Sequence, residues 1–220
     1  MDEVQYYKTI YNKFWEIQTK KYGFAVYEQN LVNLILKSKP KKVFEVGIGT
    51  GWPIGAALKE KGIEIDGCDI AESAVALAQK ELCNKKGIWV GDVMEYAGED
   101  EIYDVTYCVR ASWYIPNFHE KLLKMISMTK QGGYIIFDVM DKNSLYYLKC
   151  KYLDIKEKYL RFLGVNVDVR FGMRFVSISK MRKFIKENKL TCQFWYEKDI
   201  THSQDNINTP KVVFLCRKGK

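Results

Sequence analysis

Residues 43–55 have the sequence VFEVGIGTGWPIG, and this stretch decides the fold. It begins as a short apolar run, which predicts a buried strand, and four of its thirteen residues are glycine. Glycine loses more conformational freedom on folding than any other residue, so this density indicates that something approaches the backbone closely. The candidates are a phosphate group, a nicotinamide dinucleotide and another cofactor.

The spacing of the glycines separates these candidates. The dinucleotide fingerprint G-x-G-x-x-G requires a third glycine at a position that is Trp52 when counted from Gly47, and Ile54 when counted from Gly49. A Walker loop is excluded because no Gly-Lys-Ser/Thr follows. The loop is G-x-G-x-G, and its place between a strand and a helix indicates a cofactor loop at the carboxyl end of a first parallel strand.

Short apolar runs alternate with helical stretches on both sides of this loop. We expect strands at 42–46, 63–68, 87–90, 103–108 and 133–138, with helices at 53–61, 71–85 and 118–130 between them. Helices over 1–20 and 27–37 precede this unit. It is followed by a helix at 142–163, an exposed strand at 165–175, a helix at 179–189 and two antiparallel strands at 191–200 and 211–219. Alternating buried strands and helices predict a parallel sheet covered on both faces.

Composition narrows the class of protein. The 220 residues, 47% of them apolar and 28% charged, are typical of one globular domain. No apolar stretch of about 18 residues predicts a membrane span, and the first residues lack the apolar core of a signal peptide. We therefore expect a cytoplasmic protein without a membrane partner. Six scattered cysteines and two histidines form no clustered metal site, so no metal is expected.

Carboxylates follow the next two expected strands. Asp69 ends the second strand, about twenty residues after the glycine loop, where an acidic residue accepts hydrogen bonds from a ribose diol. Asp92 follows Gly91 at the end of the third strand, where it could accept a hydrogen bond from the amine of an adenine. Both carboxylates are therefore candidates for binding a nucleoside.

The run E-V-G-x-G-x-G from Glu45, together with Asp69 and Gly91-Asp92-Val93, resembles the class I S-adenosylmethionine-dependent methyltransferases of the small-molecule type. The resemblance covers roughly residues 40–140 and extends more weakly to the closing strands. It implies an α/β, Rossmann-like, doubly wound and mostly parallel seven-stranded sheet with an antiparallel closing strand. A single domain, 1–220, would comprise a helical lid (1–38), a cofactor-binding half (40–140), a substrate cap inserted after strand five (141–178) and a closing helix and strands (179–220).

The resemblance also implies a cofactor, S-adenosyl-L-methionine, and a product, S-adenosyl-L-homocysteine. Glu45 would order the loop and the amino group of the cofactor, and Asp69 would hold its ribose. The full set of implied cofactor contacts is Glu45, Gly47, Gly49, Gly51, Asp69, Ile70, Asp92, Val93, Arg110, Tyr7 and Tyr11. For the two tyrosines, which belong to the first helix, the simpler interpretation is packing of that helix on the sheet.

The acceptor side of the site is less well marked. Methyl transfer from a sulfonium needs positioning and a dry site, and a general base only when the acceptor is a neutral hydroxyl. Where many relatives carry a histidine pair, this chain has Trp113 and Tyr114. The candidate bases are Tyr114, Asp138, Asp141 and His119, and for His119 a solvent-facing role is the favoured interpretation. The candidate substrate contacts are Trp113, Arg170 and Arg174, since arginine suits a phosphate or carboxylate.

Together these features predict a methyltransferase acting on an oxygen or nitrogen of a small polar metabolite, phosphorylated or not, such as a sugar or headgroup precursor. We expect a monomer or homodimer. A net charge of +8 leaves an RNA or DNA methyltransferase open, but the lysines are dispersed and no Asn/Asp-Pro-Pro-Tyr/Phe is present, so nucleic acid is not the expected partner. An inactive binding protein of the same fold and a dehydrogenase also remain open at this point.

Overall fold

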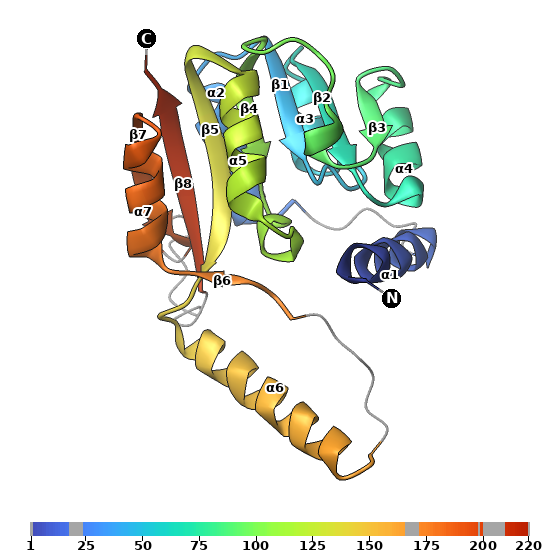
Figure 1. Cartoon of the computed structure of the whole chain (residues 1–220). Coiled ribbons are helices and arrows are strands. Elements are labelled where there is room, and N and C mark those ends of the chain that lie inside the picture. Colours follow the sequence, from blue (N-terminus) through green and yellow to red (C-terminus); the bar gives the residue numbers. More distant parts are fainter. Residues whose placement is uncertain (1, 18–23, 166–171, 198, 200–209, 220) are drawn as a thin grey trace.

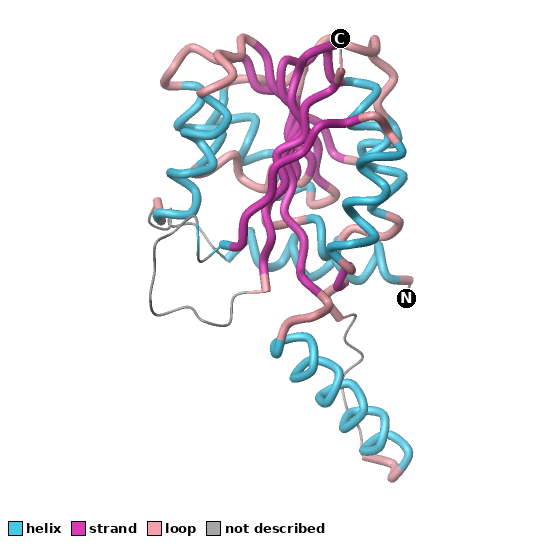
Figure 2. The backbone as a smooth tube through the Cα atoms, turned by 90° about the vertical axis from the view of Figure 1, so that its left-hand side faces the viewer, coloured by secondary structure: helices cyan, strands magenta, loops and turns pink. Residues whose placement is uncertain are grey.

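A mixed sheet runs through the centre of the molecule (Figures 1 and 2). The computed structural model describes residues 2–17, 24–165, 172–197, 199 and 210–219. The strands are β1 (Lys42–Val46), β2 (Glu64–Asp69), β3 (Ile88–Val90), β4 (Tyr103–Cys108), β5 (Thr129–Asp141), β6 (Phe175–Val176), β7 (Leu190–Tyr196) and β8 (Lys211–Lys218). Their order is β3-β2-β1-β4-β5-β8-β7, with β6 pairing β5 beside this path.

Two layers of helices cover the sheet. The helices are α1 (Glu3–Ile17), α2 (Val26–Leu36), α3 (Ile54–Lys59), α4 (Glu72–Leu82), α5 (Phe118–Met128), α6 (Leu145–Phe162) and α7 (Ile178–Glu187). Buried residues of α2, α3 and α4 form one core with the sheet, and buried residues of α5 and α7 form the other. The strands between them are apolar on both faces, as expected for a doubly covered sheet.

The position of β1 creates the opening for a site. β1 pairs in parallel with β2 on one edge and with β4 on the other, in register from Val43 opposite both Ile65 and Val105. The connections leaving β1 and β4 therefore run to opposite faces of the sheet. Such a switch point leaves a crevice at the carboxyl ends of the strands, which is where ligands bind in open α/β sheets.

The sequence predicts this architecture well. The seven-stranded path is confirmed: β5 is antiparallel to β8, and β8 is antiparallel to β7. The predicted exposed strand at 165–175 is wrong in its described part, because residue 165 and residues 172–174 are not in a strand and only Phe175–Val176 pairs with β5. Residues 166–171 lie outside the described part of the chain.

Two helices stand apart from the covered sheet (Figures 1 and 2). α1 is held against α4 by hydrogen bonds of 3.1 Å from the Ser73 N–H and hydroxyl to Asn12 and by an ion pair of 3.1 Å between Lys8 and Glu72. α6 follows β5 directly and projects away from the body of the protein. Within the described residues, no helix is both long enough and apolar enough to cross a membrane.

Candidate active site

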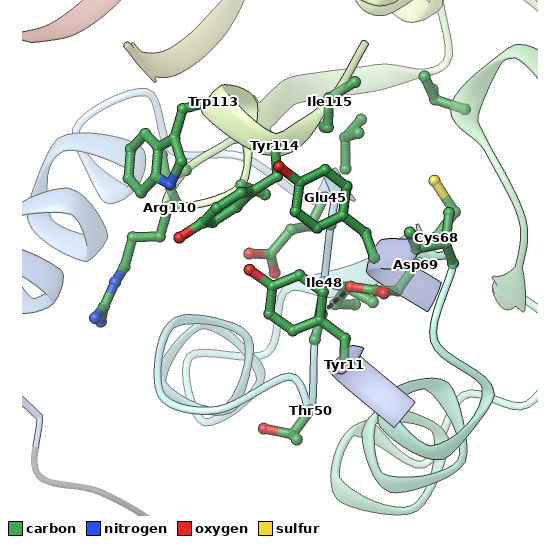
Figure 3. Close-up of a pocket in the computed structure, with 18 of the residues that line it drawn as sticks. Tyr11, Glu45, Ile48, Thr50, Cys68, Asp69, Arg110, Trp113, Tyr114 and Ile115 are labelled. Carbon is green, nitrogen blue, oxygen red and sulfur yellow. Dashed lines mark hydrogen bonds between the residues drawn. The ribbon is translucent and has the colours of Figure 1, made fainter. Parts of the chain in front are cut away.

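A cavity of about 620 Å³ lies at the switch point of the sheet. Its lining comes from the glycine loop (47–55), the ends of β1, β2 and β3 with the residues after them, the segment after β4, and α1. A volume of this size is typical of small-molecule and cofactor sites. Figure 3 shows the side chains of Tyr11, Glu45 and Asp69 converging on one space.

The glycine loop is shaped partly by the protein itself. Gly47 has φ +74°, and a Cβ there would lie 2.6 Å from the Cβ of Ala111 in the segment after β4. Gly51 also has φ +74°, and its Cβ would meet the side chain of Leu82 at 3.0 Å. Both glycines are therefore required for the loop to approach its neighbours, whatever ligand the cavity takes.

Asp69 fixes the loop to the next helix. One carboxylate oxygen accepts a hydrogen bond from the Gly49 N–H at 2.9 Å, and the other accepts one from the Ala71 N–H at 2.9 Å. Burial raises the pKa of this carboxyl, and the backbone N–H groups of Ala71 and Gly49 oppose that rise. Asp69 also lines the cavity, and a carboxylate offers about four acceptor positions, so these backbone bonds do not use its full capacity to accept hydrogen bonds.

Glu45 is a buried acid in the floor of the cavity. Its side chain accepts a hydrogen bond of 2.9 Å from the Tyr107 hydroxyl. Burial raises its pKa to about 8, the Tyr107 bond lowers it, and the nearby Asp69 charge raises it further. At neutral pH this carboxyl is therefore mostly protonated until a cation in the cavity favours its ionised form.

Aromatic rings from two segments form one wall. The Tyr114 ring lies 5.4 Å from the Tyr7 ring and 5.7 Å from the Tyr11 ring, centroid to centroid. Burial raises the pKa of Tyr7 to about 12 and also raises the pKa of Tyr11. The phenols of Tyr7 and Tyr11 therefore stay protonated and uncharged at neutral pH. The part of α1 that lines the cavity is aromatic and aliphatic, so it covers the cavity with a largely apolar surface.

Another part of the lining includes two charged residues that no sequence pattern indicated, Glu28 and Lys211. Glu28 of α2 is buried, and its Oε1 pairs with the Arg110 guanidinium. The other oxygen, Oε2, and the indole Nε1 of Trp113 are buried without a hydrogen-bond partner among the described residues. Lys211 of β8 lies over the Trp113 ring, with its Nζ 5.9 Å from the centroid. Buried polar atoms are nearly always paired, so Oε2 and Nε1 indicate a place for a ligand.

Several predicted cofactor contacts line the cavity as expected. Gly47, Gly49, Gly51, Glu45, Asp69, Ile70, Asp92, Val93, Arg110, Tyr7 and Tyr11 all belong to the lining. Asp92 is also engaged by the chain itself, because it accepts a hydrogen bond from the Met94 N–H and pairs with Lys121 at 2.9 Å. The roles assigned to these residues remain predictions.

Of the predicted general bases, only one lies in the cavity lining. Tyr114 lines the cavity, whereas Asp138 and His119 do not. Asp138 is fully buried and accepts hydrogen bonds from the Arg110 N–H at 2.9 Å and the Tyr27 hydroxyl at 2.8 Å, so it supports the wall from behind. The exposed His119 packs its ring edge-on against Phe184 of α7, 4.9 Å away. Asp141 accepts from the Asn143 N–H and the Tyr196 hydroxyl and is not in the lining either.

Of the two predicted arginine contacts, the structure describes Arg174 only. Arg174 pairs with Glu3 of α1 and donates a hydrogen bond of 3.0 Å to the Tyr114 carbonyl, so it ties α1 to the wall and does not line the cavity. Arg170 lies outside the described residues. Trp113 lines the cavity (Figure 3). Of the two predicted substrate contacts that the structure describes, Trp113 lines the cavity and Arg174 does not.

Residues 44–137 match a family model described as a methyltransferase domain. The chain is 27% identical over 113 residues to the ubiquinone biosynthesis O-methyltransferase of Azoarcus sp. strain BH72, covering 49% of this chain and 48% of that protein. It is 21% identical over 197 residues to the enzyme of that name from Vibrio parahaemolyticus, covering 86% and 82%. The chain spans about half the length of several such relatives, including the one from Azoarcus.

Solved structures share the fold. Magnesium protoporphyrin IX methyltransferase from Synechocystis PCC 6803, crystallised with SAH, has a TM-score of 0.67 at 16% identity and covers 99% of this chain and 100% of its own. The [4+2]-cyclase SpnF has a TM-score of 0.61 at 13% identity, covering 87% and 81%. The predicted class I, Rossmann-like fold is thus confirmed.

The wall behind the cavity gives a prediction about stability. We expect Asp138→Ala to lower the free energy of unfolding by about 1–3 kcal/mol, because it leaves the Arg110 N–H and the Tyr27 hydroxyl buried without an acceptor. Tyr27→Phe removes one of these contacts only, and should cost less. Urea denaturation near neutral pH measures both effects. Equal stability of the Asp138→Ala variant and the unaltered protein would contradict the supporting role.

Proposed function

Because residues 44–137 match the model of a methyltransferase domain, we propose that this chain is an S-adenosylmethionine-dependent methyltransferase acting on an oxygen or nitrogen of a small molecule. The observation that carries the proposal is the pairing of Asp69 with the Gly49 N–H at the switch point, beside a cavity of about 620 Å³. A carboxylate in that place, next to a glycine loop, suits a nucleoside with a free ribose diol.

The donor set in the cavity fits S-adenosylmethionine. Asp69 takes the ribose hydroxyls, and Ile70 and Val93 pack against the adenine. The carboxyl of Glu45, with its pKa near 8, ionises for the ammonium group of the methionine moiety. The backbone of Gly47 and Gly49 gives that moiety room. The cofactor supplies an activated methyl group, so the chain has to orient the acceptor and exclude water.

Water is excluded by α1. Tyr7 and Tyr11 close the cavity together with Tyr114, and their protonated phenols offer hydrogen bonds without competing as nucleophiles. A dry cavity strengthens every electrostatic contact inside it and protects the sulfonium from side reactions. This is the role that we expected of a helical lid.

The acceptor is best described as a neutral hydroxyl compound with a flat apolar body. Rotation of two cavity-lining side chains would bring Glu28 Oε2 to such a hydroxyl as an acceptor and Trp113 Nε1 as a donor, and each atom is buried without a partner among the described residues. The aromatic wall packs well against a planar ring. The relatives are named for O-methylation in ubiquinone biosynthesis, which favours oxygen over nitrogen.

The expected phosphorylated sugar or headgroup precursor is not retained. Arg110 already pairs with Glu28, and Arg174 already pairs with Glu3, so neither guanidinium is set aside for a phosphate. A phosphate would also meet the Glu28 carboxylate in the same wall. Glu28 therefore replaces Asp138 and His119 as the group best placed to take the proton of the acceptor hydroxyl, with Tyr114 orienting that hydroxyl.

A binding protein or an enzyme with different chemistry is the second candidate. The observation that favours it is the fold of SpnF, which is titled a [4+2]-cyclase and shares this architecture. Fold alone therefore does not fix the reaction. Transfer of a labelled methyl group decides between the two.

The ribose contact gives a prediction about cofactor affinity. We expect Asp69→Ala to weaken S-adenosylmethionine binding by about 1–3 kcal/mol in calorimetry, the cost of losing charged hydrogen bonds. Asp104→Asn is the matched control, since Asp104 accepts hydrogen bonds from the Lys41 and Lys42 N–H groups at the opposite end of the sheet. The control should bind as the unaltered protein does. Equal affinity of the Asp69→Ala variant would remove Asp69 from the site.

The raised pKa of Glu45 gives a prediction about pH. The empty site holds a proton below about pH 8, and binding an ammonium group requires its release. Affinity for S-adenosylmethionine should therefore rise with pH between about 6 and 7.5, by up to tenfold per unit for one proton released. Glu45→Gln should flatten this dependence, because an amide has no proton to release. A steep dependence in that variant would assign the proton to another group.

The acceptor assignment is tested with a panel of compounds and a methyl-labelled cofactor. We expect phenols and catechols to be labelled and sugar phosphates not to be. With a labelled phenol as substrate, Glu28→Gln should lower kcat by roughly a hundredfold or more, as expected for loss of a general base, and leave cofactor affinity unchanged. Labelling of phosphorylated compounds alone would overturn the acceptor class, and the absence of any transfer would favour the second candidate.

A further inference from the structure

Helix α6 carries a continuous apolar stripe that faces solvent. Its large side chains recur every three or four residues and so share one face of the helix. Phe162 is 85% exposed, Leu145 69% and Tyr152 66%. The members of the stripe are Leu145, Leu148, Tyr152, Ile155, Tyr159 and Phe162. Exposed apolar patches of this kind mark contact surfaces.

The charges of the same helix are sorted around this stripe. At 3.6 residues per turn, Lys149 and Lys156 fall beside one edge of the stripe, and Lys151 and Lys158 fall beside the other. Both acidic residues of α6, Asp154 and Glu157, fall on the face opposite the stripe. The outward side of α6 is therefore apolar along its middle and basic along both borders.

The first turn of α6 packs against its own chain through residues outside the stripe. Tyr147 packs its ring edge-on against Phe175 of β6 with centroids 5.1 Å apart, and Tyr146 lies 6.2 Å from the same ring. The stripe therefore points away from the contacts that hold the helix. In Figures 1 and 2 α6 extends clear of the sheet, so a broad partner can reach it.

We propose that α6 docks on an anionic lipid surface and lies in the plane of the interface. Apolar side chains along one face with lysines on both borders are the pattern of interfacial helices, in which the stripe enters the acyl boundary and the lysines meet lipid phosphates. A second copy of this chain is disfavoured as the occupant, because two stripes face to face would bring their lysine borders together. The net charge of +8 adds to that repulsion.

This inference goes beyond the proposed methyl transfer and does not depend on it. The sequence led us to expect no membrane partner because no stretch is apolar enough to span a bilayer. An interfacial helix needs no such stretch, since its polar face remains in water. The proposed peripheral docking through α6 differs from that expectation and requires no spanning segment.

Sedimentation with lipid vesicles tests the proposal. The full chain should bind vesicles of phosphatidylcholine mixed with phosphatidylglycerol, bind phosphatidylcholine alone much more weakly, and be released by salt. The double variant Ile155→Ser with Phe162→Ser should lower binding roughly tenfold or more. Its control, Leu77→Ser with Leu123→Ser, changes two apolar residues exposed elsewhere, at 38% and 44%, and should bind normally.

The basic borders are tested in the same way. Lys149→Gln with Lys156→Gln should weaken binding by roughly fivefold for each lysine, since each basic residue near an anionic surface contributes about that factor. Lys61→Gln with Lys86→Gln removes equal charge from exposed positions outside α6 and should have little effect. Circular dichroism and S-adenosylmethionine titration verify that every variant is folded.

Three results would overturn the proposal. The first is no binding of the unaltered chain to anionic vesicles, and the second is equal binding by the stripe variant and the unaltered chain. The third is a dimer in lipid-free sedimentation that Ile155→Ser with Phe162→Ser dissociates, which would assign the stripe to a second copy. Failure of the proposed methyl transfer is read separately, from the absence of labelled product.

Discussion

The parallel pairing of β1 with both β2 and β4 is the constraint on which the site depends. It brings the glycine loop, Asp69 and the segment after β4 to one edge of the sheet. The loop can enter this space only because Gly47 and Gly51 have no side chains to meet Ala111 and Leu82. The two glycines therefore have two effects. They allow the loop to pack against its neighbours, and they leave its backbone open to a ligand.

Buried carboxyl groups then give each part of the cavity a different property. Asp69 holds the loop by accepting two backbone N–H groups, and Asp138 holds the wall through Arg110 and Tyr27. Glu45 remains largely protonated, because burial disfavours its charge more than the Tyr107 bond favours it. Residues of one chemical type thus serve as a clamp, a support and a responsive acid according to their burial and their hydrogen-bond partners.

The cofactor half of the molecule was predictable because its signals are local. Each buried strand is an apolar run, and Asp69 and Asp92 follow such runs directly. The places of Glu28 and Lys211 in the cavity lining were not predictable. They belong to α2 and β8, and no short sequence pattern links them to Trp113. Asp138 was expected at the end of a strand, but β5 continues to Asp141 and the Asp138 carboxylate accepts hydrogen bonds from Arg110 and Tyr27 outside the cavity lining. Arg174 failed because its partner, Glu3, lies at the other end of the chain.

The contacts that attach α1 to the rest of the protein differ in strength. Its polar contacts include an exposed ion pair between Lys8 and Glu72, hydrogen bonds between Asn12 and Ser73, and an ion pair between Glu3 and Arg174. Contacts of the exposed kind are worth about 1 kcal/mol or less each. The larger part of the attachment is the buried Tyr7 ring, which packs against Tyr114, so α1 is held over the cavity mainly by the same aromatic rings that line it.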